Sequence, residues 1–91
     1  MPYQNIVGAA TTVVRSGPGI LKSITVNQPI ASATVTIYDN TAGSGTKIGT
    51  ITLPASLVSQ GPMTALYDLD FGTGLTLVTT GAGLDLTVSW R

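Results

Sequence analysis

The sequence predicts an all-β domain, a small antiparallel β-sandwich that is jelly-roll-like and has about seven strands. Apolar residues recur with a period of two along most segments, and no segment shows the 3.6-residue period of an amphipathic helix. Gly and Pro clusters separate these segments at short, fairly regular spacing, as in sandwiches and barrels. The 91 residues allow one domain, which we place at residues 11–91 after an arm at 1–10.

Residues 1–10 have no clean alternation and are expected to form an extended arm. Tyr3, Ile6 and Val7 have no partners in the local pattern. One alternative is a frayed terminus, the usual state of such a segment. The other is a segment that adds a strand to a neighbour or lies on a larger particle. In that case, deleting residues 2–9 would abolish particle binding and leave a folded module.

The first two expected strands follow this arm. Thr11 to Arg15 is rich in β-branched residues, which are enriched in strands. In the second, from Ile20 to Asn27, Ile24 and Val26 alternate with polar residues. The cluster Gly17-Pro18-Gly19 separates the two segments and predicts a turn between them.

The expected strand at residues 32–39 places Ala33, Val35 and Ile37 on one side. Tyr38 is out of phase with these residues and is therefore the more credible exposed aromatic side chain. Tyrosine is enriched at protein interfaces, so we expect Tyr38 at a subunit contact. A contact with a glycan on a host cell is the alternative.

The next strand, at residues 47–53, has Ile48 and Ile51 on opposite faces, and Gly49 between them predicts a β-bulge. Residues 53–60 are the one stretch that could hold a turn of helix, which Pro54 and Pro62 would keep short.

Three strands complete the expected set, at residues 63–71, 75–79 and 84–91. The last alternates most regularly, and Trp90 is in phase with its leucines. Core packing therefore explains Trp90 better than stacking on a sugar. Between the last two strands, Gly81-Ala82-Gly83 predicts a hairpin, because glycine adopts positive φ without steric cost.

Charged residues make up 9% of the chain, against about 25% in a typical soluble domain. Four cations and four aspartates are scattered and form no basic patch, which excludes a nucleic-acid partner. No apolar run reaches the roughly 18 residues that a membrane helix needs, and no secretory signal is visible, so we expect no membrane partner and synthesis in a cytoplasm. A surface this poor in charge is open to self-association, and a homo-oligomer is expected.

The chain has no His, Cys or Glu, so a Ser or Thr nucleophile would lack the usual activating base. We expect no enzymatic activity and no cofactor. Asp39, Asp68 and Asp70 could together hold Ca²⁺. The competing interpretation is that Asp68 and Asp70 face solvent and Asp39 caps a turn through the backbone. The Gly-rich runs at 43–47 and 72–74 precede strands, whereas a phosphate-binding loop precedes a helix.

Three runs resemble small proteins encoded in the structural-gene regions of tailed phages. They are VVRSGPGILKSITVN at 13–27, TVTIYDNTAGSGTKI at 34–48 and YDLDFGTGLTLVTTG at 67–81. The resemblance covers residues 11–91 and does not include the first ten residues. It implies a head decoration, cement or fibre protein, with a β-sandwich that assembles, frequently as a trimer, on a capsid lattice or along a fibre.

The expected function is therefore that of a structural virion protein of a tailed bacteriophage. It would decorate or cement the capsid through non-covalent contacts with the major capsid protein, and it would be located on the capsid surface after synthesis in the host cytoplasm. Tyr3, Ile6, Val7 and Tyr38 are the expected capsid or subunit contacts. The alternative is a tail or fibre module that binds a host-surface glycan. An exposed aromatic cluster would favour the glycan module, and a flat, Thr-rich exterior would favour decoration.

Overall fold

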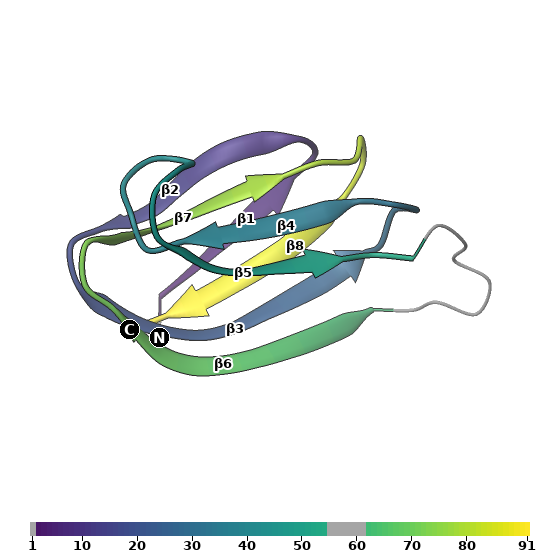
Figure 1. Cartoon of the computed structure of the whole chain (residues 1–91). Coiled ribbons are helices and arrows are strands. Elements are labelled where there is room, and N and C mark those ends of the chain that lie inside the picture. Colours follow the sequence, from purple (N-terminus) through teal and green to yellow (C-terminus); the bar gives the residue numbers. More distant parts are fainter. Residues whose placement is uncertain (1, 55–61) are drawn as a thin grey trace.

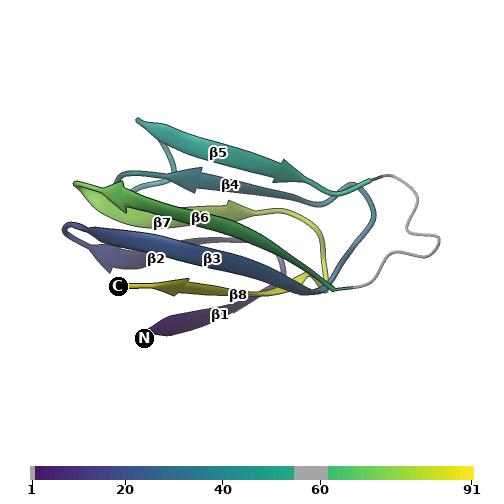
Figure 2. The same ribbon diagram turned by 90° about the horizontal axis from the view of Figure 1, so that it is seen from below.

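The computed structural model describes residues 2–54 and 62–91, which form two four-stranded antiparallel sheets packed face to face (Figures 1 and 2). Sheet A has the order β1-β8-β3-β6, and sheet B has the order β2-β7-β4-β5. The strands are β1 (Tyr3–Val7), β2 (Ala10–Ser16), β3 (Gly19–Gln28), β4 (Thr34–Tyr38), β5 (Lys47–Thr52), β6 (Met63–Phe71), β7 (Gly74–Thr79) and β8 (Asp85–Trp90). The all-β sandwich predicted from the sequence is confirmed.

The strand order follows from one long antiparallel pairing. β1 pairs with β8, β2 with β7, β3 with β6 and β4 with β5. The chain thus behaves as a hairpin whose outgoing half is β1 to β4 and whose returning half is β5 to β8. Further pairing of β3 with β8 and of β4 with β7 joins these ribbons into two sheets. An eight-stranded double sheet wound in this way is a jelly roll.

The core lies between the two sheets and consists of the inward members of the alternating strands. Ile24, Val26, Val35 and Ile37 are fully or almost fully buried, as their alternation predicts. Trp90 is also buried, with 9% of its surface exposed, so its assignment to the core is confirmed. The other buried apolar side chains are Ile6, Leu21, Ala33, Leu53, Phe71, Leu75, Leu77, Leu84, Leu86 and Val88.

The first strand was not expected. The sequence predicts a separate arm at residues 1–10, but Tyr3–Val7 is β1 and pairs with β8 along its whole length. The described chain therefore has eight strands instead of seven. Alternation fails to reveal β1 because it lies at the edge of sheet A and buries one side chain, that of Ile6.

The hairpin predicted at Gly81-Ala82-Gly83 is wrong. Gly81 and Gly83 do adopt positive φ, 106° and 86°. However, β7 belongs to sheet B and β8 to sheet A, so the glycine turn carries the chain from one sheet to the other. The glycines therefore predict correctly that the chain turns here, but they do not predict whether the two flanking strands pair with each other.

The bulge predicted at Gly49 is confirmed. Ile37 lies opposite Gly49 and Tyr38 lies opposite Lys47, so Ile48 is the extra residue on β5. The helical turn expected at residues 53–60 falls almost entirely on residues 55–61, which lie outside the described residues. In the described part of the chain no helix is long and apolar enough to cross a membrane.

The loop from Asp39 to Thr46 folds back over the outer side of sheet B. Thr76 of β7 points to that side, yet it is completely buried, and its hydroxyl donates to the carbonyl oxygen of Asn40 at 2.7 Å. A Cβ placed on Gly43 would approach the Val78 side chain to 2.8 Å, so a larger residue would require the loop or that side chain to shift. The outer side of sheet B is thus partly covered.

Candidate interaction surface

The outer side of sheet A carries short polar side chains from all four strands, beside the exposed apolar side chains of Tyr3, Val7 and Leu66. We call the polar set the polar face, and it consists of Asn5, Ser23, Thr25, Asn27, Thr64, Asp85, Thr87 and Ser89. They occupy the alternate positions left when the apolar residues turn inward. One row of the register crosses the whole sheet, because Thr87 lies opposite Asn5 and Thr25, and Thr25 lies opposite Thr64.

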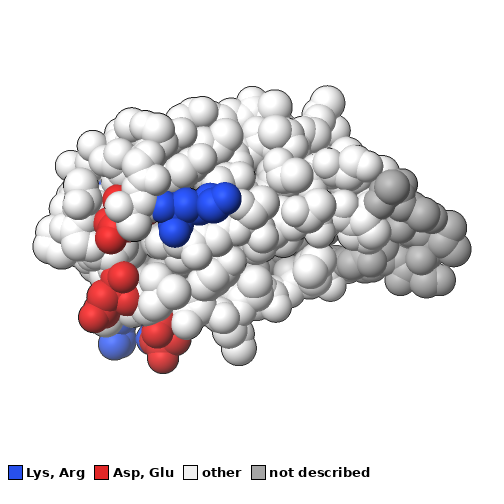
Figure 3. Space-filling view, viewed as in Figure 1, with Lys and Arg blue, Asp and Glu red and all other residues white. Residues whose placement is uncertain are grey.

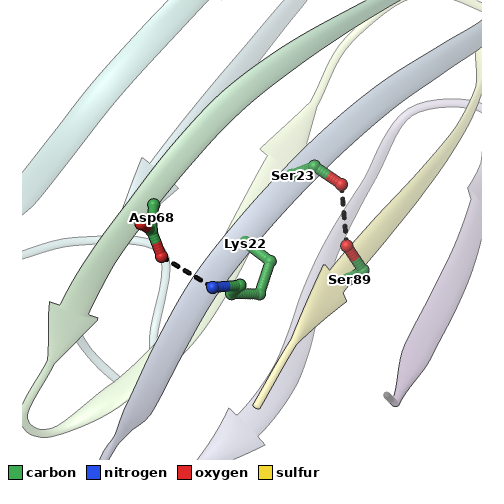
Figure 4. A network of polar contacts seen from close by, with 4 residues as sticks. All are labelled: Lys22, Ser23, Asp68 and Ser89. Carbon is green, nitrogen blue, oxygen red and sulfur yellow. Dashed lines mark hydrogen bonds and ion pairs between the residues drawn. The ribbon is translucent and has the colours of Figure 1, made fainter.

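The polar face is cross-linked by hydrogen bonds between strands. The Ser23 and Ser89 hydroxyls are 2.7 Å apart (Figure 4), and those of Thr25 and Thr64 are 3.0 Å apart. Near the start of β8, Asp85 Oδ1 accepts from Asn5 Nδ2 at 2.7 Å.

Asn27 completes the network, and its Nδ2 donates to Asp85 Oδ1 at 3.2 Å and to Thr87 Oγ1 at 3.1 Å. Cross-strand pairs of this kind stabilise a sheet and fix its side chains. The polar face is therefore ordered before any partner arrives.

This arrangement does not activate a nucleophile. Ser23 is paired with Ser89, a second hydroxyl that cannot serve as a general base at neutral pH. Asp85 is the one carboxylate of the polar face, and it accepts from two amide groups and from no hydroxyl in the described structure. The chemistry that the face offers is hydrogen bonding and shape.

The four expected contact residues do not form one surface. Tyr3 and Val7 lie on the outer side of β1 with 71% and 61% of their surface exposed. Ile6 is 4% exposed and belongs to the core, so it cannot contact a partner while β1 is in place. Tyr38 is half-buried and lies in β4 of the other sheet, opposite Thr76 and Lys47.

Asp39 caps a turn, as one of the two sequence interpretations holds. Its Oδ1 accepts from the backbone N–H of Thr73 at 2.9 Å, of Gly72 at 3.1 Å and of Gly74 at 3.3 Å. The bonds from Thr73 and Gly72, and more weakly the one from Gly74, lower the pKa of Asp39. This single carboxylate ties the β4–β5 loop to the β6–β7 turn.

Asp68 and Asp70 both face solvent on β6, as the alternation predicts. Asp68 Oδ1 lies 2.7 Å from Lys22 Nζ, and this partner lowers the pKa of Asp68. No group of three or more metal-ligating acidic side chains forms among the described residues. Asp39 and Asp68 thus have different partners, and the three aspartates do not gather into one group in the described structure.

Seven of the eight charged residues lie at one end of the sandwich. This charged end contains Arg15, Lys22, Asp39, Lys47, Asp68, Asp70 and Arg91. In Figure 3 the visible charged side chains all lie in the left half of the view. Asp85 is the exception and sits at the opposite end of β8, opposite Val7. The larger part of the described surface therefore carries no charge.

No cavity opens in the described part of the chain, and no buried polar side-chain atom there lacks a hydrogen-bond partner. Comparisons with protein-family models, with curated proteins and with solved structures found no match for this chain. The candidate site is accordingly a surface, defined by the polar face and the exposed edge of β1 beside it.

Part of this surface can be predicted from the sequence. Ser23, Thr25, Thr87 and Ser89 are the polar members of clearly alternating segments. Their meeting on one surface depends on β3 lying beside β8, although 60 residues or more separate the two halves of each pair. The matching hydroxyl residues on β3 and β8 are the signal that could have indicated their pairing. That signal can be interpreted only if the jelly-roll strand order is assumed first.

Proposed function

We propose that this chain is a structural protein of a tailed-bacteriophage particle that decorates the capsid surface through non-covalent contacts with the lattice of the major capsid protein. The observation that carries the proposal is the polar face, a charge-poor surface of mutually bonded hydroxyl and amide groups on a rigid sheet. Such a surface suits a partner of matching shape. The resemblance of residues 11–91 to tailed-phage structural proteins supports the same assignment.

The distribution of charge supports contacts that tolerate changes of ionic strength. Contacts between exposed charges weaken as salt screens them over a Debye length of about 10 Å at 0.1 M. Seven of the eight charged residues lie at the charged end, and the polar face includes one, Asp85. A capsid contact made by the polar face would depend little on salt.

Decoration stabilises a shell by mass action. A subunit that binds the assembled lattice and not the free capsid protein shifts the equilibrium toward assembly, by an amount that grows with its occupancy. The trimer implied by the resemblance matches the three-fold positions of capsid lattices and belongs to this proposal. So does the absence of catalysis, which the lack of His, Cys and Glu supports.

The fold itself favours neither capsid decoration nor glycan binding. Jelly rolls occur both in viral capsid proteins and in lectins, and a fold does not imply a function. The alternative, a tail module that binds a glycan, has one observation in its favour. Tyr3 is an exposed aromatic ring in the same register row as Ser89 and Ser23. A single ring at an edge is less than the aromatic cluster that sugar stacking would favour.

Co-sedimentation with particles that lack the protein tests the proposal, with heads and isolated tails scored separately. We expect saturable binding to heads at a stoichiometry that matches a lattice position, with little change between low and high salt. Binding to tails alone, or to neither, contradicts decoration, and a glycan array would then test the alternative.

A matched pair of variants locates the contact. Thr25→Lys places a charge in the centre of the polar face, and Thr50→Lys places the same charge on the exposed outer side of β5 in sheet B. We expect the first to weaken head binding and the second to leave it unchanged. The reverse result would show that the polar face is not the contact surface.

A further inference from the structure

The sandwich has four edge strands, β1 and β6 in sheet A and β2 and β5 in sheet B. An edge strand exposes backbone N–H and C=O groups that can pair with a strand of another chain. Natural proteins prevent this with bulges, which twist the edge away, and with charged side chains on the edge. The four edges of this chain differ in both respects.

Three of the edges carry a bulge and at least one exposed charge. On β2 the extra residue is Val14, next to Arg15, and on β5 it is Ile48, next to Lys47. On β6 the register with β3 slips by one residue between Leu66 and Leu69, beside the exposed Asp68 and Asp70. Each of these edges is a poor template for a further strand.

β1 alone among the described edge strands has neither feature. Its five residues, YQNIV, are uncharged, and they pair with β8 without any shift of register from Tyr3 to Val7. It also exposes two of the four large hydrophobic side chains that the described surface carries, Tyr3 and Val7. β1 is therefore an open, uncharged edge strand without a bulge.

The backbone of β1 directs alternate residues outward. Trp90 N donates to Pro2 O at 3.2 Å, and Gly8 N donates to Leu84 O at 2.7 Å. In an antiparallel ladder the residues that bond a given neighbour alternate, so the even-numbered residues from Pro2 to Gly8 face β8. The N–H and C=O groups of Tyr3, Asn5 and Val7 consequently point away from sheet A.

We propose that β1 binds β1 of a second copy of this chain, antiparallel, across a two-fold axis at Asn5. Tyr3 then lies opposite Val7 of the second copy, Asn5 lies opposite Asn5, and each opposed pair exchanges two backbone hydrogen bonds. The outward backbone groups of β1 all find partners in this register. The two four-stranded A sheets become one continuous sheet of eight strands.

The side chains of β1 make a second copy the fitting partner. The two-fold axis places each exposed Tyr3 against an exposed Val7, an aromatic and β-branched pair that stabilises neighbouring strands. The segment has no charge that would be opposed by itself. At the axis, Asn5 Nδ2 is already held by Asp85 and by the Leu86 carbonyl of its own chain, which leaves its backbone free to pair. This two-fold contact concerns the free protein in solution, whereas the trimer proposed above concerns its assembly at the three-fold positions of a capsid lattice.

Light scattering coupled to size-exclusion chromatography tests the dimer with the full chain. We expect a mass of twice the 9.3 kDa of one chain, falling toward the monomer on dilution. Val7→Pro removes an N–H that points away from sheet A, a position at which an edge strand tolerates proline. This variant should lower the association constant about tenfold or more, because each dimer loses two backbone hydrogen bonds. Leu66→Lys, at the exposed apolar residue of the bulged β6, should leave the mass unchanged.

A charge exchange tests the register and does not depend on the folding of the proline variant. Val7→Lys alone should weaken the dimer, because it removes the contact of Val7 with Tyr3 of the second copy, and Val7→Lys combined with Tyr3→Glu should strengthen it again, because the two positions face one another across the axis. Asn5→Cys should form a disulfide-linked dimer on oxidation much faster than Thr11→Cys does. The Cα atoms of an opposed hydrogen-bonded pair lie about 5.5 Å apart, within disulfide range, and the natural chain has no cysteine. A monomer at all concentrations up to about 1 mM, or any oligomer that Val7→Pro and Val7→Lys leave intact, overturns the proposal.

Discussion

Lys22 and Asp68 form an ion pair across two consecutive bulges of sheet A, with Lys22 Nζ 2.7 Å from Asp68 Oδ1 (Figure 4). Lys22 is the extra residue of β3 relative to β8, and β6 in turn has an extra residue opposite Lys22. A regular strand would place Lys22 in phase with Ile24 and thus in the core. The bulge turns its side chain outward and lets Leu21 be buried instead.

The conformation of Asp68 should matter more than its charge. Its φ is 54°, in the left-handed region, where β-branched residues are strained and glycine is not. We expect Asp68→Val to lower the melting temperature by about 4–8 °C and Asp68→Gly to leave it almost unchanged, because an exposed ion pair contributes little. Thermal unfolding followed by circular dichroism measures both.

Asp70→Val is the control for this pair of variants. Asp70 is exposed on the same strand and has no positive φ, so valine should be tolerated there. Equal losses in Asp68→Val and Asp68→Gly would contradict the conformational explanation and assign the effect to the ion pair.

The bulge at Lys22 also shows where sequence reasoning about the fold stops. Alternation correctly predicts which faces of 20–27 and 84–91 are buried, because a half-buried strand must alternate. It cannot show that Leu21 and Ile24 share a face three residues apart, since that depends on an extra residue accommodated by two neighbouring strands. Strand order is equally non-local. The glycines at 81 and 83 indicate a turn and do not indicate that β8 pairs with β1.

Two glycines near the charged end should respond differently to alanine. A Cβ on Gly19 would lie 2.7 Å from the Arg91 carbonyl oxygen and 2.7 Å from the Phe71 ring, whereas a Cβ on Gly72 would meet nothing within 4 Å. Gly19→Ala should cost about 1–3 kcal/mol of unfolding free energy, as overpacking does. Gly72→Ala, which does not require positive φ, should be neutral or slightly stabilising because it restricts the unfolded chain.

Chemical denaturation of the two alanine variants measures the difference. Because Arg91 contributes a backbone oxygen and Phe71 is buried, neither obstacle is the free end of a flexible side chain. An unchanged midpoint for Gly19→Ala would mean that the chain after β8 moves easily, and the close approach of these segments would then not be a constraint on the fold.

Stability should fall in acid partly through Asp39. Hydrogen bonds from the backbone N–H groups of Thr73 and Gly72 lower the pKa of Asp39 below the ordinary value of 3.8. A lowered folded-state pKa stabilises the protein above the unfolded-state pKa, and this contribution is lost as the pH falls through the folded-state pKa. We expect the melting temperature of the natural chain to decrease below about pH 4. The melting temperature of Asp39→Asn should decrease less steeply over the same pH range.

Asp68 is a second aspartate with a lowered pKa, and it serves as the control in this pH series. Its partner Lys22 is screened by salt, whereas the backbone bonds of Asp39 are short-range. At high salt, the melting temperature of Asp68→Asn should therefore depend on pH in the same way as that of the natural chain. The pH dependence of Asp39→Asn should still differ from that of the natural chain. Identical acid limbs for Asp39→Asn and the natural chain would contradict the role of the cap.

The candidate surface was predicted less completely than the fold. Tyr3, Val7 and Tyr38 fall outside the local apolar pattern, which predicts contact residues, and the first two are indeed exposed. The same pattern predicts Ile6 as a contact, but Ile6 is buried, because an edge strand that sends one side chain inward shows no alternation. β1 stands out as an unprotected edge strand because the other three edge strands carry bulges and charges. This comparison requires the folded structure, since the sequence does not show which strands lie at the edges.

Thr79 should hold the corner between β1 and β2 through its buried hydroxyl. Thr79 Oγ1 donates to Gly8 O at 2.7 Å and accepts from Ala10 N at 3.1 Å. Thr79→Val keeps the shape and removes both bonds, so it should cost about 1–3 kcal/mol of unfolding free energy. Thr52→Val, on an exposed position of β5, should change stability by less than about 0.5 kcal/mol. Amide hydrogen exchange should also accelerate at Ala10 in the Thr79 variant, because its N–H loses an acceptor. Unchanged exchange at Ala10 would mean that the backbone hydrogen bonds of the strands are sufficient to hold Gly8 and Ala10. Thr79 would then contribute packing and not hydrogen bonds that fix β1.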